Sequence, residues 1–133
     1  MAKKTISKLK KELDKWFSLY IRYREAINGV TRCFTCGKID EVKRLQCGHF
    51  QSRRFLSTRF DEINCQVQCA GCNVFKYGEQ FRFSVRLDEK YGSGTSLDLE
   101  KKSREIRKIA RLEYEDLIKE YKERVEKLKG DCL

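Results

Sequence analysis

Two Cys-x-x-Cys pairs, Cys33-Phe-Thr-Cys36 and Cys69-Ala-Gly-Cys72, constrain the fold of this chain more than any other feature. A gap of two residues lets both sulfur atoms of a pair reach one tetrahedral ion. Four such thiolates therefore predict a closed structural zinc site. The only histidine of the chain, His49, lies between the two pairs. It could replace a cysteine as a ligand, but four cysteines already complete the tetrahedron, so we expect His49 to be free for another role.

The composition favours a fold that is stabilised by a metal site. Hydrophobic residues are 40% and charged residues 38% of the 133 residues, which leaves material for only a small core. Seven cysteines are an odd number, and neither a signal-peptide core nor a membrane-spanning apolar run is present in the sequence. We therefore expect a cytoplasmic protein, not attached to a membrane, with reduced cysteines. Cys47 and Cys65 could exchange into the zinc site, but burial as small hydrophobic residues is favoured, and Cys132 is expected in a disordered tail.

Positive charge is concentrated in the first half of the chain. Residues 1–60 carry 15 Lys or Arg against 5 Asp or Glu, whereas residues 61–133 carry 15 of each. The net charge of +10 therefore lies over the first helix and the approach to His49. A polyanion such as nucleic acid is the natural partner for such a field, although a charge that only serves solubility is the plainer alternative.

Periodicity and turn residues divide the chain into three parts, which are residues 1–29, 30–95 and 96–133. Apolar residues at helical spacing predict an amphipathic, basic helix over residues 3–27, ended by Asn28-Gly29. The middle part is expected to contain a hairpin over residues 30–47, a basic loop over 48–60, an extended stretch over 64–68 and a helix from about Ala70. A long charged helix is expected over residues 97–129, either solvated or packed on a helical partner.

The residues left over from the zinc site suggest a hydrolytic centre. If Cys69 and Cys72 point at zinc from the start of a helix, Asn73 is turned about 100° away from Cys72. A hairpin carrying His49 and packed on that helix would place the imidazole and the Asn73 amide across a small cleft. Hydrolysis of a phosphodiester needs a neutral imidazole to accept a proton from water and a hard cation on the phosphate. Oxygen ligands suit magnesium or manganese, whereas the thiolates suit zinc.

Several segments of the chain combine into a recognisable pattern. They are Phe17-Ser-Leu-Tyr-Ile-Arg22, Cys33-Phe-Thr-Cys-Gly37, Cys47-Gly-His-Phe50, Arg59-Phe-Asp-Glu-Ile-Asn64, Gln68-Cys-Ala-Gly-Cys-Asn73, Tyr77-Gly78 and Leu87-Asp-Glu-Lys-Tyr-Gly92. Their order resembles the His-Asn-His, or ββα-metal, endonuclease superfamily. Over about residues 13–95 the chain resembles more narrowly the NinG/Rap recombination proteins of lambdoid phages.

The resemblance implies an α+β fold with a zinc-stapled, treble-clef-like ββα-metal core between long N- and C-terminal helices. It also implies a structure-specific endonuclease that cuts branched recombination intermediates of DNA, such as Holliday junctions or D-loops, in the host cytoplasm. His49 would be the general base and Asn73 the ligand of the catalytic Mg²⁺ or Mn²⁺. Asn64 would brace the loop that holds His49, and the four paired cysteines would hold zinc.

The chain departs from the superfamily pattern at one position. Many members have a metal-binding Asp or His immediately before the general base, where this chain has Gly48. The cation could be held by one Asn and several water molecules, or a carboxylate could supply a second ligand. The candidate carboxylates are Asp40, Asp61 and Glu62. The sequence leaves both alternatives open.

Arginine and lysine residues around His49 are the candidate DNA contacts. They are Lys43, Arg44, Arg53, Arg54 and Arg59. No helix with base-reading residues at its exposed start is apparent, so we expect binding through the DNA backbone and shape. A branched junction presents two strands to cut, so we also expect a homodimer formed through the terminal helices.

Two functions without catalysis compete with the nuclease. One is a zinc module that binds nucleic acid or a protein with the same cysteines and basic loop. The other is a helical adaptor whose long helices recruit partners, with zinc only as a clip.

Overall fold

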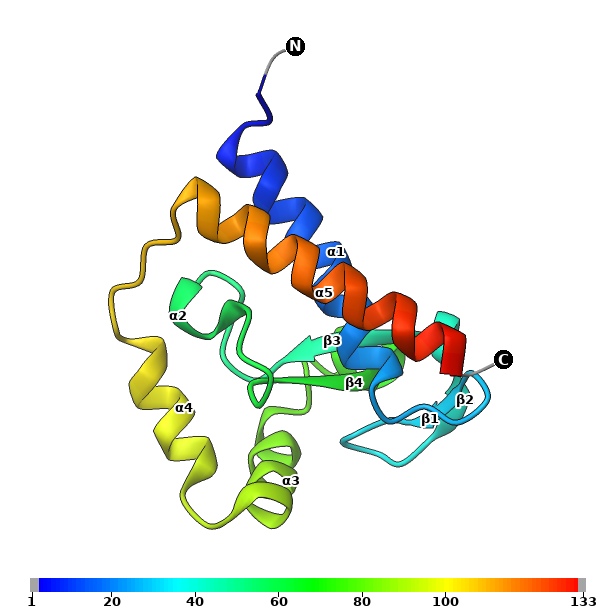
Figure 1. Ribbon diagram of the computed structural model, residues 1–133. Helices are drawn as coiled ribbons and strands as arrows, with labels where there is room; N and C mark the ends of the chain where they lie inside the picture. Colours follow the sequence, from blue (N-terminus) through cyan, green and yellow to red (C-terminus); the bar gives the residue numbers. More distant parts are fainter. Residues whose placement is uncertain (1–2, 132–133) are drawn as a thin grey trace.

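The computed structural model describes residues 3–131 and combines helices with two small antiparallel sheets (Figure 1). The predicted fold class is confirmed: an α+β chain with small hairpins, a four-cysteine cluster suited to zinc, and packed terminal helices. In chain order the elements are α1 (Ile6–Tyr23), β1 (Val30–Arg32), β2 (Ile39–Glu41), η1 (Val42–Arg44), β3 (Leu45–His49), α2 (Leu56–Arg59), β4 (Cys65–Cys69), η2 (Gly71–Phe75), α3 (Gln80–Tyr91), α4 (Thr95–Ser103) and α5 (Arg111–Asp131). No helix among the described residues combines the length and apolar character needed to cross a membrane.

The two terminal helices pack against each other along their lengths (Figure 1). They run in the same direction, because Arg111 donates to the Lys4 carbonyl at one end and Lys129 lies over the Tyr23 ring at the other. The buried faces repeat every three or four residues, as an amphipathic helix requires. These faces are Leu9, Leu13, Phe17 and Ile21 on α1, and Tyr114, Ile118, Tyr121 and Val125 on α5. The apolar faces of the two terminal helices are therefore covered within one chain, and the expected homodimer stays a prediction.

The predicted single helix over residues 97–129 is wrong, because two helices, α4 and α5, occupy this region. Leu99 of α4 packs on Phe83 and Leu87 of α3, whereas α5 packs on α1. One straight helix cannot reach both surfaces, so the chain turns between residues 104 and 110, where Ile106 is 93% exposed. The first helix also ends earlier than predicted, at Tyr23, because Ile27 and Val30 form a bridge around the turn.

The predicted hairpin over residues 30–47 is split between two sheets. β1 pairs with β2 around the first cysteine pair, whereas β3 pairs with β4, which follows only after a long connection. The β3–β4 register places Leu45 opposite Cys69 and His49 opposite Cys65. A hydrogen bond of 2.8 Å from the Phe34 N–H to the Val67 carbonyl joins the first knuckle to β4. This arrangement brings the two cysteine pairs together.

The segment after the second cysteine pair is less helical than predicted. Residues 71–75 form one wide turn, η2, and the chain then passes through Tyr77 and Glu79 in the left-handed region, with φ of 53° and 51°. Helix α3 begins only at Gln80. The predicted basic loop over residues 48–60 likewise begins within β3 and contains the short helix α2.

Candidate functional site

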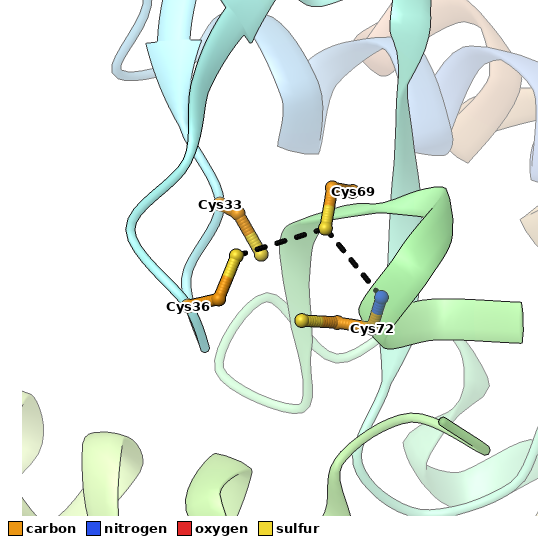
Figure 2. Close-up of side chains that lie close together, drawn as sticks. All are labelled: Cys33, Cys36, Cys69 and Cys72. Carbon is orange, nitrogen blue, oxygen red and sulfur yellow. Dashed lines mark hydrogen bonds between the residues drawn. The ribbon is translucent and has the colours of Figure 1, made fainter. Parts of the chain in front are cut away.

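The four paired cysteines form a cluster with the dimensions of a zinc site (Figure 2). Their sulfur atoms all lie within 4.8 Å of one another, and the Sγ atoms of Cys36 and Cys69 are 3.7 Å apart. Four thiolates around a tetrahedral zinc ion at about 2.3 Å would be separated by about 3.8 Å. The first pair lies on the turn between β1 and β2, and the second at the end of β4 and in η2. The donor set and its spacing therefore fit a structural zinc ion.

The buried Thr35 hydroxyl contacts the Cys33 sulfur of this cluster and lowers the pKa of that thiol. Gln68 donates to the Thr35 hydroxyl oxygen at 3.1 Å, and Thr35 Oγ1 lies 3.4 Å from the Cys33 sulfur. Burial would raise the pKa of the Cys33 thiol, but hydrogen bonds from the Thr35 hydroxyl and nearby backbone N–H groups lower it to about 6. Burial raises the pKa of Cys72 to about 12. A bound cation would therefore be needed to keep all four sulfurs deprotonated at neutral pH.

His49 and Asn73 line the same cleft, which has a volume of about 580 Å³. His49 ends β3, and its Nε2 lies 3.0 Å from the Arg59 carbonyl oxygen. A carbonyl oxygen only accepts hydrogen bonds, so Nε2 carries the proton and Nδ1 keeps the lone pair. Asn73 comes from η2 and donates through Nδ2 to Gln46 Oε1 at 2.8 Å, which fixes the orientation of its amide.

The imidazole of His49 is neutral at physiological pH. Burial, reinforced by the cations of Arg53 and Arg59, lowers its pKa to about 4 against the opposing effects of the Arg59 carbonyl and Asp14. A neutral ring with a free lone pair can accept a proton, whereas a protonated ring could not.

Asn64 is fully buried and ties down the loop that follows His49. Its Oδ1 accepts from the Gln51 N–H at 2.7 Å, and its Nδ2 donates to the carbonyls of Gln51 and Thr58 at 3.1 and 3.0 Å. This geometry suits the bracing role expected for Asn64, which stays a prediction. It places Asn64 behind the cleft, since Asn64 does not line it.

Gly48 has no room for a side chain. A Cβ built on Gly48 would lie 1.8 Å from Oε1 of Gln68, a diagonal neighbour on β4, where Gln66 is the residue directly opposite Gly48. Gln68 cannot simply move aside, because its Nε2 donates hydrogen bonds to the Thr35 hydroxyl and to the Gly78 carbonyl. Its buried Oε1 has no hydrogen-bond partner among the described residues. A metal-binding side chain before His49 is therefore excluded by the packing of β4.

We expect Gly48→Ala to lower the free energy of unfolding by about 1–3 kcal/mol, the usual cost of forcing extra atoms into a packed interior. Chemical denaturation of the zinc-loaded protein measures it. The same substitution in a Gln68→Ala background relieves the clash and should cost clearly less. Equal costs in the two backgrounds would contradict this explanation.

The three carboxylates considered as second metal ligands are occupied elsewhere, and none of them lines the cleft. Asp61 accepts from the N–H groups of Ile63 and Asn64 and pairs with Lys102. Glu62 accepts hydrogen bonds from Tyr20 on α1 and from Tyr121 and Arg124 on α5. Asp40 lies in β2. The described residues that line the cleft could therefore bind a cation through amide and hydroxyl oxygens, and none of them carries a carboxylate.

The predicted basic contacts fall into three positions. Arg53 lines the cleft, and Arg54 lies next to it with its guanidinium 4.7 Å from the Phe55 ring centre. Arg59 instead faces inward, where both arms of its guanidinium bind Asp14 at 3.0 and 2.5 Å. Lys43 and Arg44 lie on η1 and do not line the cleft. Arg59 therefore pairs with Asp14 within the protein, and of these predicted contacts only Arg53 is among the described residues that line the cleft.

Other cleft residues had not been singled out as site residues from the sequence. They are Gln51, Ser52, Phe55, Tyr77 and Gln80. Tyr77 is 88% exposed and lies close in sequence to two other exposed aromatic residues, Phe75 and Phe81. The signal available in the sequence was the group of aromatic residues around Gly78, which are Phe75, Tyr77 and Phe81.

Comparison with known protein families identifies the family of the chain. Residues 1–131 match the sequence model of the family described as Bacteriophage Lambda NinG protein. Searches of curated proteins and of solved structures found no significant match. The match extends over the cysteine cluster, the cleft and both terminal helices, and the chain therefore belongs to the NinG family.

Proposed function

We propose that this protein is a metal-dependent endonuclease that hydrolyses phosphodiester bonds in branched DNA, with His49 as the general base. The observation that carries the proposal is the cleft in which a buried, neutral imidazole meets an oriented asparagine amide and an arginine. This combination supplies a proton acceptor, an oxygen ligand and a cation for phosphate at one place.

His49 acts on the attacking water. The Arg59 carbonyl holds Nε2–H and so fixes both the tautomer and the plane of the ring. The lone pair on Nδ1 accepts the proton as the water oxygen attacks phosphorus. Arg53, on the rim of the same cleft, binds the non-bridging phosphate oxygens.

The leaving oxygen develops negative charge, and a divalent cation in the cleft would supply its stabilisation. When bound, magnesium or manganese would polarise the phosphate and stabilise the negative charge on that oxygen. Asn73 is the residue that would hold it, through Oδ1, with the remaining ligands coming from water and the phosphate itself. Magnesium keeps several water ligands in protein sites, so a cleft without a carboxylate is compatible with it.

The order of elements supports placement in the ββα-metal superfamily. Two antiparallel strands, β3 and β4, are followed by the turn of η2, with the histidine at the end of the first strand and the asparagine in the turn. The wide turn takes the place of the longer helix that we expected from the sequence. The zinc cluster then fixes η2 and the end of β4 against the turn between β1 and β2.

Branched DNA is the substrate class that this surface favours. Base stacking is interrupted at a branch point, which exposes base faces, and exposed aromatic rings next to basic residues bind such faces by stacking. Tyr77 borders the cleft, with Phe75 and Phe81 nearby in sequence, 77% and 84% exposed. The excess positive charge of residues 1–60 supplies the attraction to phosphate.

The test compares a synthetic four-way junction with a linear duplex of the same sequence, each incubated with the zinc-loaded protein with and without magnesium. We expect strand cleavage that requires magnesium and is faster on the junction. No cleavage of either DNA with magnesium or manganese, together with tight binding, would favour the second candidate, a non-catalytic zinc module. The lack of a carboxylate among the described cleft residues is the observation in favour of that candidate.

A further inference from the structure

A second group of metal-binding side chains surrounds the general base. Cys47, His49 and Cys65 each place one ligand atom within 4.8 Å of the other two. None of the three belongs to the four-cysteine cluster. The expectation that Cys47 and Cys65 serve only as buried small residues therefore overlooks their shared position beside His49.

The strand register explains why these three residues meet. Alternate residues of a strand point to the same face, so Cys47 and His49 share one face of β3. Cys65 is directly opposite His49 on β4, and cross-strand partners also share a face. The grouping is thus built into the β3–β4 pairing and does not depend on a mobile loop.

The group is reachable from solvent although part of it is buried. Cys65 is completely buried, against α1, but Cys47 and His49 line both the large cleft and a smaller one of about 220 Å³. An ion could therefore enter through either cleft and reach the Cys65 sulfur behind them. Asn64 Nδ2 lies 4.0 Å from this sulfur and the Arg59 carbonyl oxygen 3.5 Å from it, so two polar groups already contact Cys65 at the edge of the hydrophobic core.

Two sulfurs and one imidazole nitrogen select a particular kind of ion. Thiolate and imidazole suit zinc and related thiophilic cations, whereas magnesium and manganese prefer oxygen. Three protein ligands leave the fourth tetrahedral position for water, unlike the closed four-cysteine site. The second group should therefore bind zinc more weakly than the first and fill only after it.

We propose that Cys47, His49 and Cys65 form a second, lower-affinity zinc site whose occupation switches the nuclease off. The neutral imidazole has a single free lone pair, so His49 cannot ligate zinc and accept a proton from water at the same time. Zinc at the four-cysteine cluster thus builds the fold, and excess zinc at the second group blocks the cleft. The inhibitory consequence depends on the proposed nuclease function, whereas the binding site itself does not.

Counting zinc ions tests the site without reference to activity. The full-length reduced protein is equilibrated with buffers of rising free zinc, and bound metal is measured by mass spectrometry. We expect a plateau near one ion and a second near about two ions per chain. Cys47→Ser should keep the first ion and lose the second, while Ser18→Ala, which removes a hydroxyl from the smaller cleft, should keep both. A single plateau in the wild-type protein would overturn the site.

A cobalt spectrum and a cleavage assay complete the test. Cobalt added to the zinc-loaded protein should give a sulfur-to-cobalt charge-transfer band in the wild type and lose most of it in Cys47→Ser. In the cleavage assay, zinc at the second plateau should abolish magnesium-dependent cutting by the wild type and spare Cys47→Ser. Equal inhibition of the two proteins would overturn the switch. If the wild type cuts no DNA at all, the nuclease proposal fails and the ion count alone decides the site.

Discussion

Replacing His49 with alanine should lower the rate of junction cleavage by about 100- to 10,000-fold, the usual contribution of a general base. The effect is large because His49 is the only histidine of the chain, and none of the other described residues lining the cleft carries an imidazole or a carboxylate. Single-turnover cleavage with saturating protein measures the chemical step separately from DNA binding. The four-cysteine cluster does not include His49, so the zinc content should stay at about one ion per chain at low free zinc.

A second variant, His49→Gln, distinguishes the loss of the proton-accepting nitrogen from the loss of the hydrogen bond to the Arg59 carbonyl. Alanine also removes the hydrogen bond to the Arg59 carbonyl, whereas His49→Gln can still donate an N–H to it. Both variants should lose cleavage alike and bind the junction as the wild type does. Cleavage by His49→Gln within about threefold of the wild-type rate would reject the role of His49 as the general base.

In the pH–rate profile, the fall in cleavage rate at acidic pH should occur at a much lower pH than it would with a general base of ordinary histidine pKa. Because burial lowers the pKa of His49 to about 4, the ring stays neutral between pH 5 and pH 7, where an exposed histidine would become protonated. The cleavage rate should therefore not fall by half near pH 6.5. The same shift lowers folding stability as the pH falls from about 6.5 to 4, because the unfolded chain binds the proton more readily there.

The parts of the fold that the sequence predicts depend on local rules. The spacing of the cysteine pairs predicts a four-thiolate cluster, since each pair spans only two residues and needs no knowledge of distant packing. Helical periodicity likewise predicts an amphipathic helix near the N-terminus. Its buried face is Leu9, Leu13, Phe17 and Ile21, although the helix ends at Tyr23 and not at residue 27.

The errors concern contacts between distant segments. Strand β3 is only five residues long, and its own sequence does not specify which strand it pairs with. Its true partner β4 is determined by contacts between distant segments, at the zinc cluster and where Gln68 packs over Gly48. The break between α4 and α5 has the same origin, because α4 packs on α3 whereas α5 packs on α1, and these two surfaces are apart from each other. The inward orientation of Arg59 follows from Asp14, which is 45 residues away in sequence.

Removing zinc should unfold the β3–β4 unit and with it the cleft. The buried cluster in this region consists of Cys33, Cys69 and Cys72 with only two aliphatic residues, Leu45 and Val67. Without an ion the three sulfurs have little to hold them together. Structural zinc sites contribute apparent binding free energies of about 10–16 kcal/mol, which exceeds what so small a core provides by itself. We expect Cys69→Ser, or chelation of the wild type, to abolish cooperative thermal unfolding of the central region.

Circular dichroism and amide hydrogen exchange can locate this loss. The α1–α5 pair has its own aromatic core, including an edge-on contact of Phe17 with Tyr121 at 5.0 Å between ring centres, so part of the helical signal should survive. Amides of β3 and β4 should lose their protection, and DNA cleavage should disappear with them. Cys47→Ser serves as the matched control, because it removes a cysteine from the same strand pair but not from the cluster. If chelated protein kept protected β4 amides, the four cysteines would be a clip on a self-sufficient fold, and the position of His49 opposite Cys65 would need another cause.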